Sequence, residues 1–220
     1  MRSQPTIYLC DDDEGVRNSL SFLLKQHGFT VRAFASGPEL LDAVDTVTPP
    51  LRGVFVLDVR MEPLPGPVVH DRLREKGYAA RNPVIFLSGH GDISAAVAAM
   101  AKGALNFVEK PATDDKLIHQ LRESLVLEEE WQAKARRREF LHALWQSLAP
   151  QQKRVAVLVG EGNLNKVIAG KLHVSDRMVE VHRSKVFEKL GVDSAAELAT
   201  TLADMRAAGI ALEGAAVDTD

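Results

Sequence analysis

This 220-residue sequence has few cysteines and aromatic residues, no long apolar run and little excess of charge of either sign. The single cysteine, Cys10, excludes an intrachain disulfide. The longest apolar run, Ala95–Ala101, is far shorter than the ~20 residues that a membrane-spanning helix needs. The first residues lack the apolar core of a signal peptide, so we expect a cytoplasmic protein without a membrane partner. With 27 basic and 30 acidic side chains, the whole chain is not a basic polyanion-binding protein, although a local basic patch is still allowed.

The first half of the chain alternates short apolar runs with helical patterns. Runs this apolar are typical of strands that are covered on both faces, as in a parallel sheet. We therefore expect an α/β fold with a doubly wound five-stranded parallel sheet, strand order 2-1-3-4-5, and helices on both faces. The five predicted strands are Ile7–Cys10, Val31–Phe34, Val54–Leu57, Val84–Leu87 and Leu105–Val108.

A long polar helical stretch follows this section. No glycine or proline interrupts the chain from Ala112 to Ala149, so the sequence predicts one long helix or two helices with a polar hinge. The charge runs Glu128–Glu130 and Arg136–Arg138 favour a solvated linker helix as the interpretation of its middle part.

The last section is predicted to be all helical. Four helices in about 60 residues, with Asn163, Ser175 and Ser194 as expected caps, predict a helix-turn-helix module. Residues 148–212 carry nine basic and seven acidic side chains, whereas the tail carries only acidic ones. The predicted organisation is thus an α/β domain (5–122), a helical linker (123–147), a helix-turn-helix domain (148–212) and an acidic tail (213–220).

Polar residues follow four of the predicted strands directly or within two residues. Asp11 and Asp12 follow the first, Asp58 the third, Ser88 the fourth and Lys110 the fifth. The carboxyl ends of parallel strands meet at one sheet edge, where ligands bind in such folds, so these side chains should converge.

This combination has a definite chemistry. Neighbouring carboxylates repel unless a cation lies between them, and oxygen ligands suit Mg²⁺. A carboxylate beside Mg²⁺ can attack a phosphoryl group, while Lys110 supplies a second positive charge and Ser88 a hydrogen bond to the phosphoryl oxygen. The sequence therefore predicts formation and hydrolysis of an aspartyl phosphate.

Four separated motifs carry a family resemblance. Leu9–Asp12, Val56–Met61 with Gly66, Ser88–Asp92 and Phe107–Pro111 together resemble a response-regulator receiver domain. The resemblance implies that Asp58 is the phosphoacceptor and that Asp11, Asp12, Asp58 and the backbone carbonyl of Arg60 surround Mg²⁺. It also implies that Ser88 and Phe107 couple phosphorylation to a distant face. The chain departs from the family at Glu62, where a proline is usual.

The helical module has a resemblance of its own. Gly162–Ala169, Val174–Ser175, Met178–Arg183 and Lys189–Val192 are similar to the LuxR-type helix-turn-helix, with departures such as Met178 for the usual Thr. Together the two modules resemble the FixJ/NarL class of transcriptional response regulators, and most closely its FixJ branch.

The predicted second helix of this module has one inward and one outward face. Val179, Val186 and Leu190 form the inward stripe. The outward face can lie in a DNA major groove, with basic side chains toward guanine or phosphate, Glu180 toward cytosine and Val181 toward a thymine methyl group. The candidate DNA-binding residues are Asn165, Lys166, Arg177, Glu180, Val181, Arg183, Ser184 and Lys185.

The expected function is that of a two-component transcription regulator. A sensor histidine kinase phosphorylates Asp58, and the protein then forms a homodimer that binds promoter DNA; RNA polymerase is a further candidate partner. The chain is expected not to be an enzyme beyond phosphorylation and dephosphorylation of its own Asp58. Two alternatives are open: a Mg²⁺-dependent phosphatase-like enzyme, and a receiver with a helical module that binds a protein partner.

Overall fold

The structure is a computed structural model that describes residues 4–47, 51–89, 100–110 and 114–212. The chain divides into two compact units, residues 1–133 and 134–220, and the buried apolar side chains form separate cores in the two. Within the described ranges, none of the helices has both the length and the apolar character that crossing a bilayer requires.

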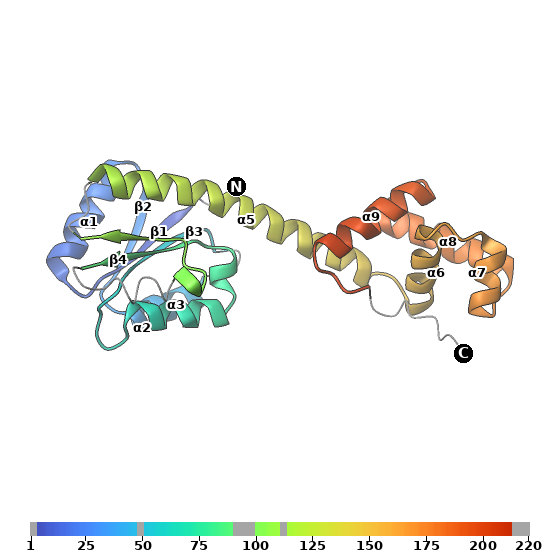
Figure 1. Cartoon of the computed structure of the whole chain (residues 1–220), viewed down its shortest axis with the longest axis horizontal. Helices are drawn as coiled ribbons and strands as arrows, with labels where there is room; N and C mark the ends of the chain where they lie inside the picture. Colours follow the sequence, from blue (N-terminus) through green and yellow to red (C-terminus); the bar gives the residue numbers. More distant parts are fainter. Residues whose placement is uncertain (1–3, 48–50, 90–99, 111–113, 213–220) are drawn as a thin grey trace. The chain divides into compact units, whose positions relative to one another are not determined.

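The first unit is built on a five-stranded parallel sheet (Figure 1). Its strands lie in the order β2-β1-β3-β4-β5, and every neighbouring pair is parallel. The predicted fold and strand order are therefore confirmed, and each strand end lies within about one residue of its predicted place. The strands are β1 (Thr6–Cys10), β2 (Thr30–Phe34), β3 (Gly53–Asp58), β4 (Val84–Ser88) and β5 (Asn106–Glu109).

Helices flank this sheet where the sequence predicts them. Side chains cap two of these helices: Asp13 Oδ1 accepts from the Val16 N–H at 2.9 Å, and Ser36 Oγ accepts from the Glu39 N–H at 3.4 Å. The sequence also predicts a helix over residues 92–102, most of which lies outside the described residues. The helices of the unit are α1 (Glu14–Gln26), α2 (Gly37–Asp45), α3 (Gly66–Glu75), the 3-10 turn η1 (Tyr78–Ala80) and the first part of α5 (Asp114–Gln146).

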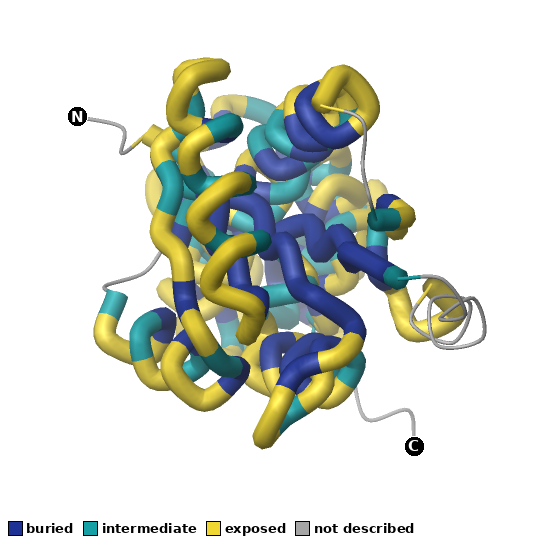
Figure 2. Tube along the Cα trace, turned by 90° about the vertical axis from the view of Figure 1, so that its left-hand side faces the viewer, coloured by how far each residue is buried: buried dark blue, intermediate teal, exposed yellow. Residues whose placement is uncertain are grey.

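Two apolar layers hold the helices on the sheet. Because side chains alternate along a strand, Ile7 and Leu9 of β1 pack in the layer that α1 and α5 cover, whereas Tyr8 and Cys10 pack in the layer that α2 and α3 cover. Figure 2 shows the resulting run of dark blue, buried strands enclosed by yellow, exposed segments. Burial on both faces explains why β1, β3 and β4 are largely apolar, whereas the edge strands β2 and β5 also carry exposed residues.

Helix α5 is continuous, so the alternative of two helices with a hinge is excluded. The interpretation of Glu128–Glu130 as solvated is wrong for Glu128, whose side chain is fully buried. Arg52 Nε donates to Glu128 Oε1 at 2.6 Å, and Arg52 Nη2 donates to Oε2 at 2.8 Å and to Glu129 Oε2 at 2.5 Å. We call the pair of Arg52 and Glu128 the α5 clamp.

Further polar contacts surround the α5 clamp at the start of β3. The Gly53 N–H donates to Glu128 Oε1 at 3.3 Å, and the buried Gln132 side chain donates to the Leu51 carbonyl at 2.8 Å. Gly53 has φ +139°, and a Cβ there would lie 1.8 Å from the Thr6 carbonyl oxygen. The middle of α5 is therefore part of the first unit rather than a free linker.

The second unit contains the predicted helices around the buried Trp145, which lies near the end of α5. Ser175 and Ser194 cap two of them as expected. The prediction of Asn163 as a cap is wrong, because Leu164 occupies that position and the Asn163 side chain donates to the Leu158 carbonyl at 2.9 Å. The helices are α6 (Pro150–Gly160), α7 (Asn165–Leu172), α8 (Asp176–Leu190) and α9 (Ala195–Ala207).

Candidate functional site

The first candidate site lies at the carboxyl edge of the sheet. Asp11 follows β1, Asp58 ends β3 and Lys110 follows β5, and β1 and β3 are direct neighbours. The Lys110 ammonium donates to Asp11 Oδ2 at 2.6 Å and to Asp58 Oδ1 at 2.5 Å. Both carboxylates are buried, since Asp11 is 1 % and Asp58 is 7 % exposed. The structure therefore brings three of the predicted residues, Asp11, Asp58 and Lys110, into direct contact.

Burial and charge oppose each other at this site. Burial raises the pKa of Asp58, and the hydrogen bond and charge of Lys110 lower it, with burial the stronger effect. Burial lowers the pKa of Lys110, but the two carboxylates together more than offset this, so its pKa is raised. The arrangement keeps the positively charged Lys110 ammonium in contact with Asp58 Oδ1.

The other two predicted ligands, Asp12 and Arg60, are exposed, unlike the buried Asp11 and Asp58. Asp12 is exposed, and its Oδ2 accepts from the Glu62 N–H at 3.2 Å. The Arg60 N–H donates to Asp58 Oδ2 at 2.8 Å, which fixes the second Asp58 oxygen. In the described ranges, no three Asp, Glu, His or Cys side chains form a group that could hold a metal ion. Asp11 and Asp58 thus form a pair around Lys110.

The two predicted switch residues differ sharply in burial. Ser88 is 4 % exposed at the end of β4, and its carbonyl accepts from the Lys110 N–H at 2.7 Å. Phe107 on β5 is 38 % exposed, so it is not a fully enclosed core aromatic. Ser88 is therefore buried at the carboxyl edge of the sheet, whereas the Phe107 ring is accessible to solvent.

Sequence reasoning missed two contributions to this site. Arg17 on α1 donates to the Asp11 carbonyl at 2.8 Å and to the Asp12 carbonyl at 3.2 Å, which ties the acidic loop to the helix. A Cβ on Gly66 would lie 2.1 Å from the Asp58 carbonyl oxygen, so only glycine fits there. The glycine was visible in the motif, but its close approach to Asp58 has no signal in the sequence.

The second candidate site is the outer face of α8. Val179, Val186 and Leu190 are buried, as the periodicity predicts. Ser175 caps the helix, and its Oγ accepts from the Met178 N–H at 3.2 Å. The residues predicted for the outward face are exposed: Arg177, Glu180, Val181, Ser184 and Lys185.

The remaining predicted DNA-binding residues link α7 to α8. Arg183 Nη1 donates to Asn165 Oδ1 at 3.2 Å, and its guanidinium lies 5.2 Å from the centre of the Phe187 ring. Lys166 in the first turn of α7 is exposed. Arg183 and Asn165 thus hold the two helices together, whereas Lys166 is accessible.

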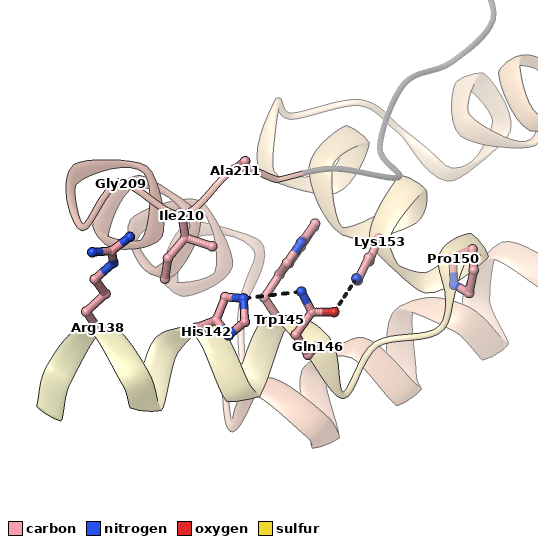
Figure 3. A pocket seen from close by; sticks show the side chains of 9 residues that line it. All are labelled: Arg138, His142, Trp145, Gln146, Pro150, Lys153, Gly209, Ile210 and Ala211. Atoms are coloured by element: carbon pink, nitrogen blue, oxygen red, sulfur yellow. Dashed lines mark hydrogen bonds between the residues drawn. The ribbon is translucent and has the colours of Figure 1, made fainter. Parts of the chain in front are cut away.

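A cavity of about 470 Å³ lies elsewhere in the second unit (Figure 3). Residues of α5, α6 and the segment after α9 line it, and the Gln146 side chain bonds both His142 and Lys153 (Figure 3). The Lys153 ammonium also lies 5.4 Å from the centre of the Trp145 ring. These contacts join the end of α5 to α6.

Comparison with known proteins identifies both units. Residues 7–122 match the response regulator receiver domain, and residues 146–202 match the bacterial regulatory proteins of the luxR family. The chain is 39 % identical over 196 residues to the C4-dicarboxylate transport transcriptional regulatory protein DctR of Rhodobacter capsulatus, which covers 88 % of this chain and 97 % of DctR. It is 36 % identical over 199 residues to the transcriptional regulatory protein FixJ of Bradyrhizobium diazoefficiens, with 90 % and 94 % covered.

Two solved structures show a likeness over most of the chain. The response regulator StyR matches with a TM-score of 0.80 and 32 % identity, covering 92 % of this chain and 100 % of StyR. Full-length FixJ from B. japonicum matches with a TM-score of 0.57 and 32 % identity, covering 93 % and 98 %. The chain therefore belongs to the FixJ/NarL class of two-component response regulators, which are phosphorylation-controlled, DNA-binding regulators of transcription.

Proposed function

We propose that Asp58 is the phosphoacceptor of this regulator. The observation that carries the proposal is the buried Asp58 carboxylate, which shares the Lys110 ammonium with Asp11 at the carboxyl edge of the sheet. An oxygen of Asp58 attacks the phosphorus of the donor, and a phosphorus–oxygen bond forms as the bond to the donor breaks. Lys110 and the Ser88 hydroxyl stabilise the charge on the transferred phosphoryl oxygens.

Mg²⁺ is the proposed cofactor of this step. Asp11, Asp12, Asp58 and the Arg60 backbone carbonyl are the residues that would hold it, once the Asp12 carboxylate, which here accepts from the Glu62 N–H, turned toward the other two. An all-oxygen donor set suits this ion. The pair of buried carboxylates on one ammonium supports the fit, because the same position already stabilises concentrated positive charge. When bound, Mg²⁺ would neutralise oxygens of the phosphoryl group.

The proposed donor is a sensor histidine kinase, and the chain's own chemistry is limited to gain and loss of the phosphoryl group at Asp58. The cytoplasm is the expected compartment, because both the kinase domain and promoter DNA are found there. The proposed domains are the receiver (5–122), the helical linker (123–147), the LuxR-type helix-turn-helix domain (148–212) and the acidic tail (213–220). The part of the linker up to residue 133 packs with the receiver as one compact unit.

The proposed recognition helix is α8, with its exposed face in the major groove of promoter DNA. Glu180 suits cytosine and Val181 suits a thymine methyl group, while the basic side chains suit guanine or phosphate. The exposure of these side chains beside a fully buried Val179 supports this orientation. The proposed contact residues are Asn165, Lys166, Arg177, Glu180, Val181, Arg183, Ser184 and Lys185.

Phosphorylation is proposed to act through Ser88 and Phe107. The buried Ser88 moves toward the phosphoryl group, and the half-exposed Phe107 ring turns into the vacated space, which changes the face formed by β5 and the start of α5. That face then pairs with a second copy of the chain, and the dimer places two recognition helices about one DNA turn apart. RNA polymerase is a further proposed partner at the promoter.

Intact-mass measurement tests the phosphoacceptor. Acetyl phosphate or the partner kinase with Mg²⁺ should add one phosphoryl group to the parent chain and none to Asp58→Asn. Asp13→Asn is the matched control, because asparagine can still cap α1 and Asp13 lies outside the proposed ligand set. Full phosphorylation of Asp58→Asn would contradict the assignment. Release of phosphate from small phosphoesters without any DNA binding would favour a phosphatase-like enzyme.

A further inference from the structure

Exposed apolar side chains of the second unit gather at two helices. Among its described residues, the large apolar side chains that are exposed lie in or directly before α7 and α8, apart from Phe140 on α5. None of them lies on α6 or α9, which pack into the core of the unit. They are Leu164 (75 % exposed), Val167 (46 %), Met178 (45 %) and Val181 (42 %).

Met178 and Val181 share the outer face of α8. They lie three residues apart in the first two turns, and residues at that spacing are neighbours on a helix surface. The Met178 N–H is fixed by the Ser175 cap, while Val179 beside it is fully buried. The helix is therefore held in a rotation that turns both apolar side chains outward.

Charged groups surround this apolar pair. Arg177, Glu180 and Lys185 on the same helix are exposed. The segment 166–190 carries six basic and three acidic side chains, so its charge is complementary to a polyanion. An apolar pair within a basic surface matches the DNA major groove, where the thymine C5-methyl group is the apolar feature between charged backbones.

We propose that Met178 reads a thymine methyl group beside the one read by Val181. The inference rests on the proposed function and adds a sequence preference to it: the operator carries two thymines under the first two turns of α8. The N-terminal residues of a recognition helix are the ones that reach base edges, which is where Met178 lies. Its unbranched, flexible thioether side chain can follow the groove edge to a methyl group.

Deoxyuridine substitution tests the proposal, because it removes only the C5-methyl group. The operator is first selected from random duplexes with the full chain in the presence of a phosphoryl donor. Each thymine is then replaced singly by deoxyuridine, and affinity is measured for the parent, Met178→Ala and Met178→Leu.

One thymine should respond through Met178 alone. Its replacement should weaken binding of the parent about fourfold, the factor that corresponds to burial of one methyl-sized group. Met178→Ala should lose this response and keep the one at the thymine under Val181, whereas Met178→Leu should retain both. Val126→Ala, an exposed apolar position on α5 of the first unit, is the matched control and should behave as the parent.

Two kinds of failure are distinguishable. If Met178→Ala shows the same deoxyuridine response as the parent at every thymine, the proposal is wrong although the protein still binds its operator. A protein partner would then be the better candidate to cover the Met178 side chain. If no duplex is selected and none forms a sequence-specific complex, the proposed function itself fails, and this inference with it.

Discussion

Replacing Glu128 with glutamine should destabilise the first unit far more than the same change at Glu129. Both carboxylates bind Arg52, but the Glu128 side chain is 0 % exposed and the Glu129 side chain is 45 % exposed. The Arg52 side chain is itself only 9 % exposed, and Glu128 raises its pKa through a hydrogen bond and its charge. Glu128→Gln therefore leaves a buried guanidinium without its enclosed counter-charge.

The expected size follows from these environments. Removing one partner of a buried ion pair costs about 3–5 kcal/mol, because the remaining charge stays out of water. Glu129 still contacts Arg52 in this variant, so we expect the lower end, ~3 kcal/mol of unfolding free energy. Glu129→Gln removes the exposed partner and leaves the enclosed Glu128 on Arg52, so it should cost less than ~1 kcal/mol. The double variant Arg52→Met with Glu128→Leu removes both charges and should recover much of the loss.

Native-state hydrogen exchange on the full chain measures this locally. Peptides that contain β1 and β3 report opening of the first unit, and peptides that contain α6 and α8 serve as the internal reference. The opening free energy at β3 should fall in Glu128→Gln and stay near the parent value in Glu129→Gln. Equal and small losses in the two variants would refute the reasoning and restore a solvated linker.

Three further results are expected. His70 is fully buried, neither of its ring nitrogens is hydrogen-bonded to a described residue, and burial lowers its pKa. Because the unfolded state then takes up the proton first, stability should be lost as pH falls below the ordinary value of 6.5, and urea unfolding of His70→Leu should lack this loss. Gly66→Ala should cost about 1–3 kcal/mol in thermal or urea unfolding and slow phosphorylation, since its Cβ would displace the Asp58 backbone; parent-like behaviour would contradict this close approach. Lys166→Ala or Lys185→Ala should reduce the slope of log affinity against log salt by about 0.9 in a DNA titration. An unchanged slope and affinity in both variants would contradict the placement of α8 in the major groove.

Periodicity and strand-end position made the fold and the acidic site predictable. Apolar runs such as Val54–Leu57 have one stable environment, a sheet covered on both faces, and the helices between them follow from capping residues such as Ser36. Once the strands are parallel, the convergence of Asp11, Asp58 and Lys110 is a consequence of topology.

Long-range pairing and side-chain exposure were not predictable in the same way. Glu128 looks like any residue of a charged helix face, and only the fold shows that Arg52, 76 residues earlier, is its partner. The prediction of Asn163 as a cap fails for a similar reason, because its side-chain amide donates to the Leu158 carbonyl of α6 instead of capping α7. Local sequence specifies which residues favour a helix end, whereas tertiary contacts decide which polar group is used.

The most direct test of the account is the operator affinity of the full chain with and without beryllofluoride or a phosphoryl donor, in the parent and in Asp58→Asn. The parent should bind its operator more tightly in the presence of the donor and should sediment as a dimer, and Asp58→Asn should show neither change. Equal affinity and equal mass in both states of the parent would contradict a phosphorylation switch at Asp58.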